Sequence, residues 1–214
     1  MKKIKILFFF SFLPLILAAA PQKPHPIRKV NQWYKAEKER SGKGFHKFAT
    51  LATVSQDNHP MTRMVELVGF SQGKGALFFT HRNTTKVEHL TSNPHAALNI
   101  WLPKTLRQVS MTGTVVEIPR QDAEKSWKRM PRFMKLTFMA SEHKGEIDSP
   151  DVLQKRKAKL EELYKNDIPM PDAFVGYRFQ PDTITFYEIK PRNFPHKEIA
   201  HLDHDKWVVS LMEP

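Results

Sequence analysis

The 214-residue sequence contains no cysteine, which removes several kinds of chemistry at once. Disulfide bonds, thiolate metal sites, cysteine nucleophiles and the acylated cysteine of a lipoprotein are all excluded. Acidic residues are scarce beside basic ones, 22 against 34, so the formal net charge is +12. A charge of this sign favours anionic partners. The chain lacks a helix-turn-helix pattern, zinc ligands and an aromatic-basic RNA signature, so we expect a small phosphorylated molecule rather than a specific nucleic acid.

Glycine-rich nucleotide loops and hydrolase motifs are also missing. The eight glycines form neither GxGxxG nor a phosphate loop, which leaves a Rossmann or Walker interpretation without support. No serine lies in a nucleophile elbow. Three histidines near the C-terminus lie close to two aspartates, but their spacing is irregular, and we expect a solvated turn rather than a metal site. These residues are His196, His201, Asp203, His204 and Asp205.

Long hydrophobic runs are confined to the N-terminus. Three lysines precede an apolar run over residues 6–17, and three alanines follow before Pro21. This pattern predicts a signal peptide over residues 1–20 that is cleaved after Ala20, and therefore export, to the periplasm. The alternative is an uncleaved membrane anchor, although the run is short for a span of ~20 residues and Pro14 interrupts it. Cleavage removes three lysines and no acid, so the charge becomes 12 − 3 = +9.

The remaining chain predicts a mainly β protein with peripheral helices, arranged as a barrel rather than a βαβ sheet. Prolines mark residues 21–30 as an extended linker, and residues 31–41 as a short helix. The predicted strands cover residues 48–55, 61–70, 76–80, 95–102, 106–118 with a bulge at Gly113, 173–180, 183–189, 199–202 and 207–211. The predicted helices cover residues 85–92, 120–140 with a break at Pro131, and 150–166.

We divide the chain by these patterns into successive segments. An N-terminal segment, 21–44, precedes a barrel core over 45–140 and a helical connection over 141–170. Residues 171–214 return to the same barrel.

A predicted strand runs directly into a predicted helix within residues 78–90, FFTHRNTTKVEHL. Thr85 and Glu88 have the spacing of a capping box, so we expect the helix to begin at Thr85. A helix N-terminus presents unpaired amides and a partial positive charge, which attract phosphate. Lys86 adds a full charge, and Arg63 on a neighbouring strand is placed to donate two hydrogen bonds to the same anion. The alternative is that Thr85 only caps the helix while Lys86 is solvated.

Several separate blocks resemble one known family in their order and spacing. They read RMVELVGF, GALFFTHRNTTKVEHLTSNPHAALNIWL and LRQVSMTGTVVEI, followed by MPDAFVGYRFQPDTITFYEI and DKWVVSLMEP. Over residues 45–214 the chain resembles the pyridoxamine 5′-phosphate oxidase family. The resemblance implies a homodimeric split β-barrel with FMN at the dimer interface.

The resemblance also assigns residues to the flavin. Arg63 matches an arginine that contacts FMN, Lys86 a lysine on the FMN phosphate, and Gln108 a glutamine that reaches the flavin ring from the partner subunit. Cations suit a phosphate, and an amide suits the carbonyl and N–H edge of the ring. The FMN site implied by the resemblance comprises Arg63, Val65, Phe79, Thr80, Thr85, Lys86, Gln108 and Tyr187.

The positions that hold the substrate phosphate in that family are changed here. Lysine, tyrosine, arginine and serine of the family are replaced by Val68, Trp127, Met130 and Met134 respectively. Glu66 also stands where the family has an apolar residue. The candidate substrate-binding residues are Arg129, Arg132, Arg192 and His196, the last two at a spacing that differs from the family's Arg-x-His motif. The resemblance therefore favours retention of the flavin over retention of the family's substrate.

The resemblance implies an FMN-dependent oxidase. A hydride would pass from C4′ of pyridoxamine or pyridoxine 5′-phosphate to flavin N5 and then to O2, giving pyridoxal 5′-phosphate and hydrogen peroxide. Two alternatives stay open: an FMN oxidoreductase with another substrate, as in phenazine-pathway relatives, and a non-catalytic flavin- or tetrapyrrole-binding protein. Export fits none of the three easily, because FMN is made in the cytosol and would have to be acquired outside.

Overall fold

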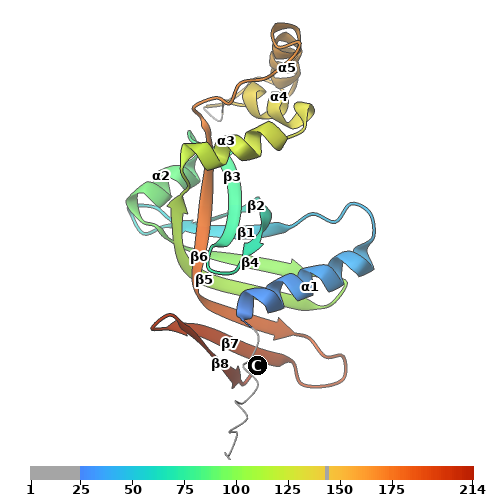
Figure 1. Cartoon of the computed structure of the whole chain (residues 1–214), viewed down its shortest axis with the longest axis vertical. Helices are drawn as coiled ribbons and strands as arrows, with labels where there is room; N and C mark the ends of the chain where they lie inside the picture. Colours follow the sequence, from blue (N-terminus) through green and yellow to red (C-terminus); the bar gives the residue numbers. More distant parts are fainter. Residues whose placement is uncertain (1–24, 143–144) are drawn as a thin grey trace, which may run out of the picture.

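Antiparallel strands form the body of the molecule in the computed structural model, which describes residues 25–142 and 145–214 (Figure 1). The strands of this part are β1 (Phe48–Val54), β2 (Pro60–Ser71), β3 (Gly75–His81), β4 (His95–Leu102), β5 (Arg107–Glu117), β6 (Phe174–Glu188), β7 (His196–Asp203) and β8 (Lys206–Met212). The helices are α1 (Pro26–Ser41), α2 (Thr85–Ser92), α3 (Arg120–Arg129), α4 (Arg132–Ala140) and α5 (Asp151–Leu163). The predicted signal peptide lies outside the described residues. Among the helices of the described ranges, none is long and apolar enough to cross a membrane.

The strands β1 to β6 close into a barrel. Their hydrogen-bonded order is β3-β2-β1-β4-β5-β6, and β6 pairs with β3 as well, which joins the two edges of the sheet. β7 and β8 extend the sheet from β6 as a hairpin outside the barrel (Figure 1). The predicted fold class, a mainly β split barrel with peripheral helices, is confirmed. Its core contains the inward-facing side chains of the strands, among them Leu51, Val65 and Phe78.

The C-terminal half of the barrel corrects one prediction. Residues 173–180 and 183–189 were expected as two strands, but they form the single strand β6. Pro181 lies opposite Gly113, where the register of β5 against β6 shifts, so a bulge accommodates the proline. A Cβ atom on Gly113 would lie 2.0 Å from the Gln180 carbonyl oxygen, which explains why glycine is needed there. The predicted bulge at Gly113 is confirmed.

The N-terminal helix corrects a second prediction. α1 begins at Pro26, so residues 26–30 are helical rather than extended. A proline in the first turn removes an N–H group that has no helical partner in any case. The Ile27 amide donates to Nδ1 of His25 at 3.2 Å, which caps this end. Ile27 and Val30 are buried in the barrel core, so burial holds the helix across the barrel.

A second apolar cluster lies beneath α3 and α4, outside the β3 and β6 wall of the barrel (Figure 1). Trp127, Leu136 and Phe174 are buried there. The Trp127 Nε1–H donates to the Ile168 carbonyl at 2.8 Å, so its polar group is already satisfied. The two helices therefore cover the outer face of β3 just before the chain enters α2.

Candidate functional site

The junction between β3 and α2 leaves a helix N-terminus without a side-chain cap. The helix begins at Thr85 as predicted, but the N-cap residue is Thr84, so the predicted capping box of Thr85 and Glu88 is wrong. The Thr84 hydroxyl instead donates to the His81 carbonyl at 2.9 Å and makes no bond to the helix amides. The reason is positional: Thr85 already has helical geometry and cannot reach back over the first turn. The Val87 and Glu88 amides donate to the Thr84 carbonyl, at 2.9 and 3.2 Å, so the amides of Thr85 and Lys86 are the ones that this helix end offers to an external anion.

Two cations lie at this helix end. Lys86 Nζ donates to Thr80 Oγ1 at 3.0 Å. Burial lowers the pKa of Lys86, and the nearby charge of Arg63 lowers it further. Within the described residues the two side chains bond hydroxyl and carbonyl oxygens and no carboxylate. Like charges held together without a carboxylate fit an anion such as phosphate. We call Arg63, Thr80, Lys86 and the first turn of α2 the cationic junction.

A buried hydrogen-bond chain positions Arg63 in the cationic junction. Arg63 Nη1 donates to Thr53 Oγ1 at 2.7 Å, and Thr53 Oγ1 lies 3.0 Å from Nδ1 of His89 on α2. Because arginine only donates, the Thr53 hydrogen is free to be donated to His89. Thr53 and His89 are both buried. The sequence analysis missed both residues, although an inward-facing threonine in an apolar strand is a usable signal.

A cavity of about 640 Å³ adjoins the cationic junction. The two share Thr80, whose hydroxyl accepts the Lys86 hydrogen bond and which also lines the cavity. Most of the cavity wall is apolar, formed by Val68, Phe79, Met130, Met134, Phe138 and Phe174. Phe79 stacks on Phe174 with ring centroids 5.0 Å apart, so this side of the wall is fixed. We call this space the apolar cavity. It gathers Val68, Met130 and Met134, three of the positions where the sequence departs from the family pattern.

A polar edge of the apolar cavity is formed by residues that the sequence analysis did not assign. Nδ1 of His46 lies 3.0 Å from Oε1 of Glu66, and both side chains line the cavity together with Lys47. Glu66 points outward from β2, on the face opposite to Arg63 and Val65. The His46 ring stacks on Phe48, with centroids 5.3 Å apart. This histidine–carboxylate pair is held in place by the stacking ring and by the strand.

Gln108 and Tyr187 lie on a different face of the barrel. They are opposite each other across β5 and β6, and both point outward. Gln108 Nε2 donates to Asn99 Oδ1 and to Ser110 Oγ, both at 2.9 Å. Arg63, by contrast, shares the inward face of β2 with the buried Val65. In one chain the predicted FMN residues therefore form two groups rather than one.

The four candidate substrate-binding residues are also dispersed. Arg132 donates to the carbonyls of Asn166, at 3.1 Å, and Tyr164, and Arg129 is exposed at the end of α3. Neither lines the apolar cavity in the described part of the chain. Arg192 lies in the turn between β6 and β7 with φ 63°, and His196 Nε2 lies 2.7 Å from Glu198 Oε1. His196 shares the face of β7 with Glu198, whereas Lys197 on the opposite face is the cross-strand neighbour of Tyr187, so His196 does not join Gln108 and Tyr187 either.

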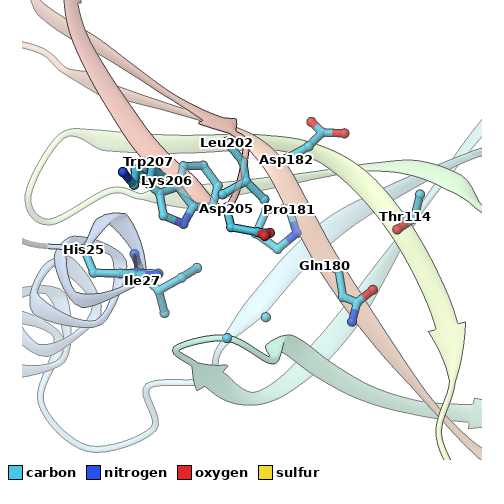
Figure 2. A pocket seen from close by; sticks show the side chains of 12 residues that line it. His25, Ile27, Thr114, Gln180, Pro181, Asp182, Leu202, Asp205, Lys206 and Trp207 are labelled. Atoms are coloured by element: carbon cyan, nitrogen blue, oxygen red, sulfur yellow. Dashed lines mark hydrogen bonds between the residues drawn. The ribbon is translucent and has the colours of Figure 1, made fainter.

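A larger cavity, about 890 Å³, is bounded by the start of α1 and by the turn between β7 and β8 (Figure 2). His25 and Trp207 pack there edge to face with centroids 6.0 Å apart. Gly75, at the start of β3, lines this cavity, whereas Thr80 near the end of β3 lines the apolar cavity. The larger cavity is lined by none of the predicted FMN or substrate residues, so volume alone does not locate the candidate site.

Comparison with known sequences points to one family. The sequence pattern of the family described as Pyridoxamine 5′-phosphate oxidase matches residues 37–164. A pyridoxine/pyridoxamine 5′-phosphate oxidase from Acaryochloris marina (strain MBIC 11017) is 33% identical over 166 residues, which cover 77% of this chain and 75% of that protein.

Two solved structures share the fold. PhzG from Burkholderia lata 383, in complex with tetrahydrophenazine-1-carboxylic acid, has a TM-score of 0.83 and 22% identity, covering 91% of this chain and 95% of that one. A pyridoxamine 5′-phosphate oxidase-related, FMN-binding protein from Nostoc punctiforme has a TM-score of 0.72 and 16% identity, covering 90% and 100%. At these identities the similarity concerns the fold.

Proposed function

The chain belongs to the pyridoxamine 5′-phosphate oxidase family, and we propose that it is an FMN-dependent oxidoreductase. The observation that carries the proposal is the cationic junction: Lys86 lies at an uncapped helix N-terminus and Arg63 is near enough for its charge to lower the pKa of Lys86, while in the described residues neither side chain bonds a carboxylate. Such a site fits the phosphate of FMN, because backbone amides and two cations act on one anion.

The residues of the junction have distinct tasks in holding the cofactor. Arg63 and Lys86 supply charge to the phosphate, while Thr53 and Thr80 fix the two side chains. The apolar cavity beside Thr80 offers a mostly apolar wall to the reacting molecule. When bound, the flavin accepts a hydride from the substrate and passes the electrons on, with dioxygen as the proposed acceptor.

We propose further that the protein acts as a homodimer. Phe48, Met64 and Trp101 form an exposed apolar patch on the outer face of β1, β2 and β4, and a patch of this kind marks an interaction surface. Trp101 is the cross-strand neighbour of Gln108. A second copy seated on the patch would bring Gln108 and Tyr187 of one subunit toward the cationic junction of the other, which accounts for the two separate groups.

The substrate has two candidates. Pyridoxine or pyridoxamine 5′-phosphate is supported by the name of the sequence relatives. The products would be pyridoxal 5′-phosphate and hydrogen peroxide, and the amine substrate would also consume water and release ammonia. A different substrate is supported by the wall of the apolar cavity, where Val68, Met130 and Met134 offer no phosphate ligand. On the basis of residues 1–20 we also propose that the protein is exported.

Titration of the purified protein with FMN tests the cofactor assignment. We expect quenching of flavin fluorescence at a one-to-one ratio, and a loss of affinity of about tenfold or more for Arg63→Gln and for Lys86→Gln. The control is Arg82→Gln. This arginine lies on the same turn but forms an exposed pair with Glu117 at 2.7 Å, so its removal should leave FMN binding unchanged.

Anaerobic addition of pyridoxine 5′-phosphate to the FMN-loaded protein then distinguishes the two candidate substrates. Loss of the visible flavin band that returns with air supports the vitamin B6 oxidase. A flavin band that persists with this substrate and is lost with another reductant supports the second candidate. Absence of FMN binding would contradict the proposal, and bound flavin that no reductant turns over would favour the non-catalytic alternative.

A further inference from the structure

The apolar cavity is built for a ring rather than for a phosphate. Its volume of about 640 Å³ lies within the range of small-molecule sites, about 300–1,000 Å³. Met130, Met134, Phe79, Phe138 and Phe174 line it, and Phe138 packs edge to face on Phe174 with centroids 5.2 Å apart, so an aromatic body meets thioethers and rings. None of these side chains donates a hydrogen bond to an anion.

The charges along the cavity cancel each other. Lys47 contributes one positive charge and Glu66 one negative charge. Arg63 and Lys86 are not among the residues that line the cavity, and Arg132 bonds the carbonyls of Tyr164 and Asn166. A phosphate dianion placed in the cavity would meet one carboxylate and one lysine. Their net attraction for the dianion would not offset the loss of its hydration.

The His46–Glu66 pair supplies a specific polar partner. Glu66 accepts the hydrogen bond of Nδ1–H in neutral His46, at 3.0 Å, which leaves Nε2 as an acceptor. An acceptor at the edge of an apolar cavity selects a hydroxyl or amino group on the molecule that enters. We infer that the apolar cavity binds an unphosphorylated aromatic alcohol or amine, whose O–H or N–H donates to His46. This inference rests on the proposed flavin function, because the cavity is taken as the substrate side of that site.

The test compares two ligands that differ only in the phosphate. Pyridoxine and pyridoxine 5′-phosphate are titrated by calorimetry into protein already saturated with FMN, so that the cationic junction is occupied. We expect the phosphate to weaken binding by at least about threefold. Met130→Arg, which adds a cation to the cavity wall, should reverse the preference and strengthen binding of the phosphorylated ligand by about tenfold. Phe133→Arg is the matched control, since Phe133 is exposed on α4 and does not line the cavity.

A second variant tests the polar partner. His46→Phe should weaken the binding of pyridoxine by about fivefold, the loss of one hydrogen bond, and leave FMN affinity unchanged. Tighter binding of the phosphorylated ligand by the unmodified protein would overturn the inference, and so would failure of pyridoxine to bind. Both results differ from failure of the proposed function, which the absence of FMN binding in the same samples would reveal.

Discussion

Arg63 is held in the cationic junction by a residue that no ligand would touch. Thr53 receives the Arg63 hydrogen bond at 2.7 Å and connects it to His89 on the helix that carries Lys86. The guanidinium, the strand and the helix are thus coupled through one hydroxyl. Burial makes this coupling strong, because a lost bond there is not replaced by water.

Thr53→Val removes the hydroxyl at nearly constant volume. Arg63 then loses a partner that fixes its position, and His89 loses its bond to β1. We expect FMN affinity to fall about tenfold and the free energy of unfolding to fall by about 1–2 kcal/mol. Fluorescence titration and urea denaturation measure the two effects.

The control is Thr137→Val on α4, where the exposed hydroxyl donates to the Phe133 carbonyl of the same helix at 2.8 Å. It should change neither quantity. If Thr53→Val lowered stability without changing FMN affinity, Thr53 would be a structural residue with no part in positioning Arg63.

Lys86 makes the binding of phosphate depend on pH in a defined direction. Burial and the charge of Arg63 place its pKa in the free protein below the ordinary 10.5. A bound phosphate favours the charged form and raises that pKa again. At a pH between the pKa of Lys86 in the free protein and its pKa in the complex, phosphate binding is accompanied by uptake of a proton. The affinity for phosphate therefore falls as the pH rises through the lowered pKa of Lys86.

We expect FMN affinity to decline between neutrality and 10.5 in the unmodified protein. Lys86→Arg should flatten this decline, because a guanidinium stays protonated throughout. Titration of the flavin itself is common to both proteins and cancels in the difference. Parallel profiles for the two proteins would contradict a role for Lys86 at the phosphate.

At the scale of elements, the buried carboxylate of Glu37 connects α1 to the barrel through hydrogen bonds. Glu37 accepts hydrogen bonds from the Lys104 amide at 2.8 Å, and from the amide and hydroxyl of Thr105 at 2.9 and 2.8 Å. Its side chain therefore organises the turn between β4 and β5. That turn precedes Gln108, so α1 influences the second group of predicted FMN residues.

Glu37→Ala removes the short hydrogen bonds of the buried Thr105 amide and hydroxyl, which keep only the longer ones to the Leu102 carbonyl, at 3.3 and 3.4 Å. We expect the free energy of unfolding to fall by about 3 kcal/mol, as measured by urea denaturation. Glu39→Ala is the matched control on the same helix, because Glu39 is exposed and its distance to Lys35 is 4.0 Å. It should cost less than about 0.5 kcal/mol. Equal losses for the two variants would show that the buried carboxylate has no special part in stability, since alanine is the better helix former at both positions.

Local sequence patterns predicted the helices and strands, but they did not predict contacts between residues that are far apart in the sequence. Alternation of apolar and polar residues located β2, and an apolar, β-branched run located β1, because both patterns are properties of one strand alone. The start of α1 was misplaced, since prolines suit both an extended linker and a first helical turn. Pairing of Thr53 with His89, and of His46 with Glu66, joins residues that are 36 and 20 positions apart. Only the closed barrel brings such residues together.

At the scale of the whole molecule, the exposed patch on β1, β2 and β4 links assembly to cofactor binding. Phe48, Met64 and Trp101 are 46%, 61% and 48% exposed, which is unusual for large apolar side chains that lie together. Gln108 lies beside this patch and points in the same outward direction. If a second copy covers the patch, loss of the dimer and loss of flavin affinity should occur together.

Trp101→Glu places a charge at the centre of the patch. We expect a monomer in light-scattering chromatography, and FMN affinity lower by about tenfold, because the contribution of the partner's Gln108 disappears. Leu163→Glu, at an apolar position on α5 that is 70% exposed, is the control and should remain dimeric with full affinity. A Trp101→Glu monomer that binds FMN as tightly as the unmodified protein would mean that one chain holds the cofactor alone. In that case Gln108 and Tyr187 would have to be removed from the flavin site.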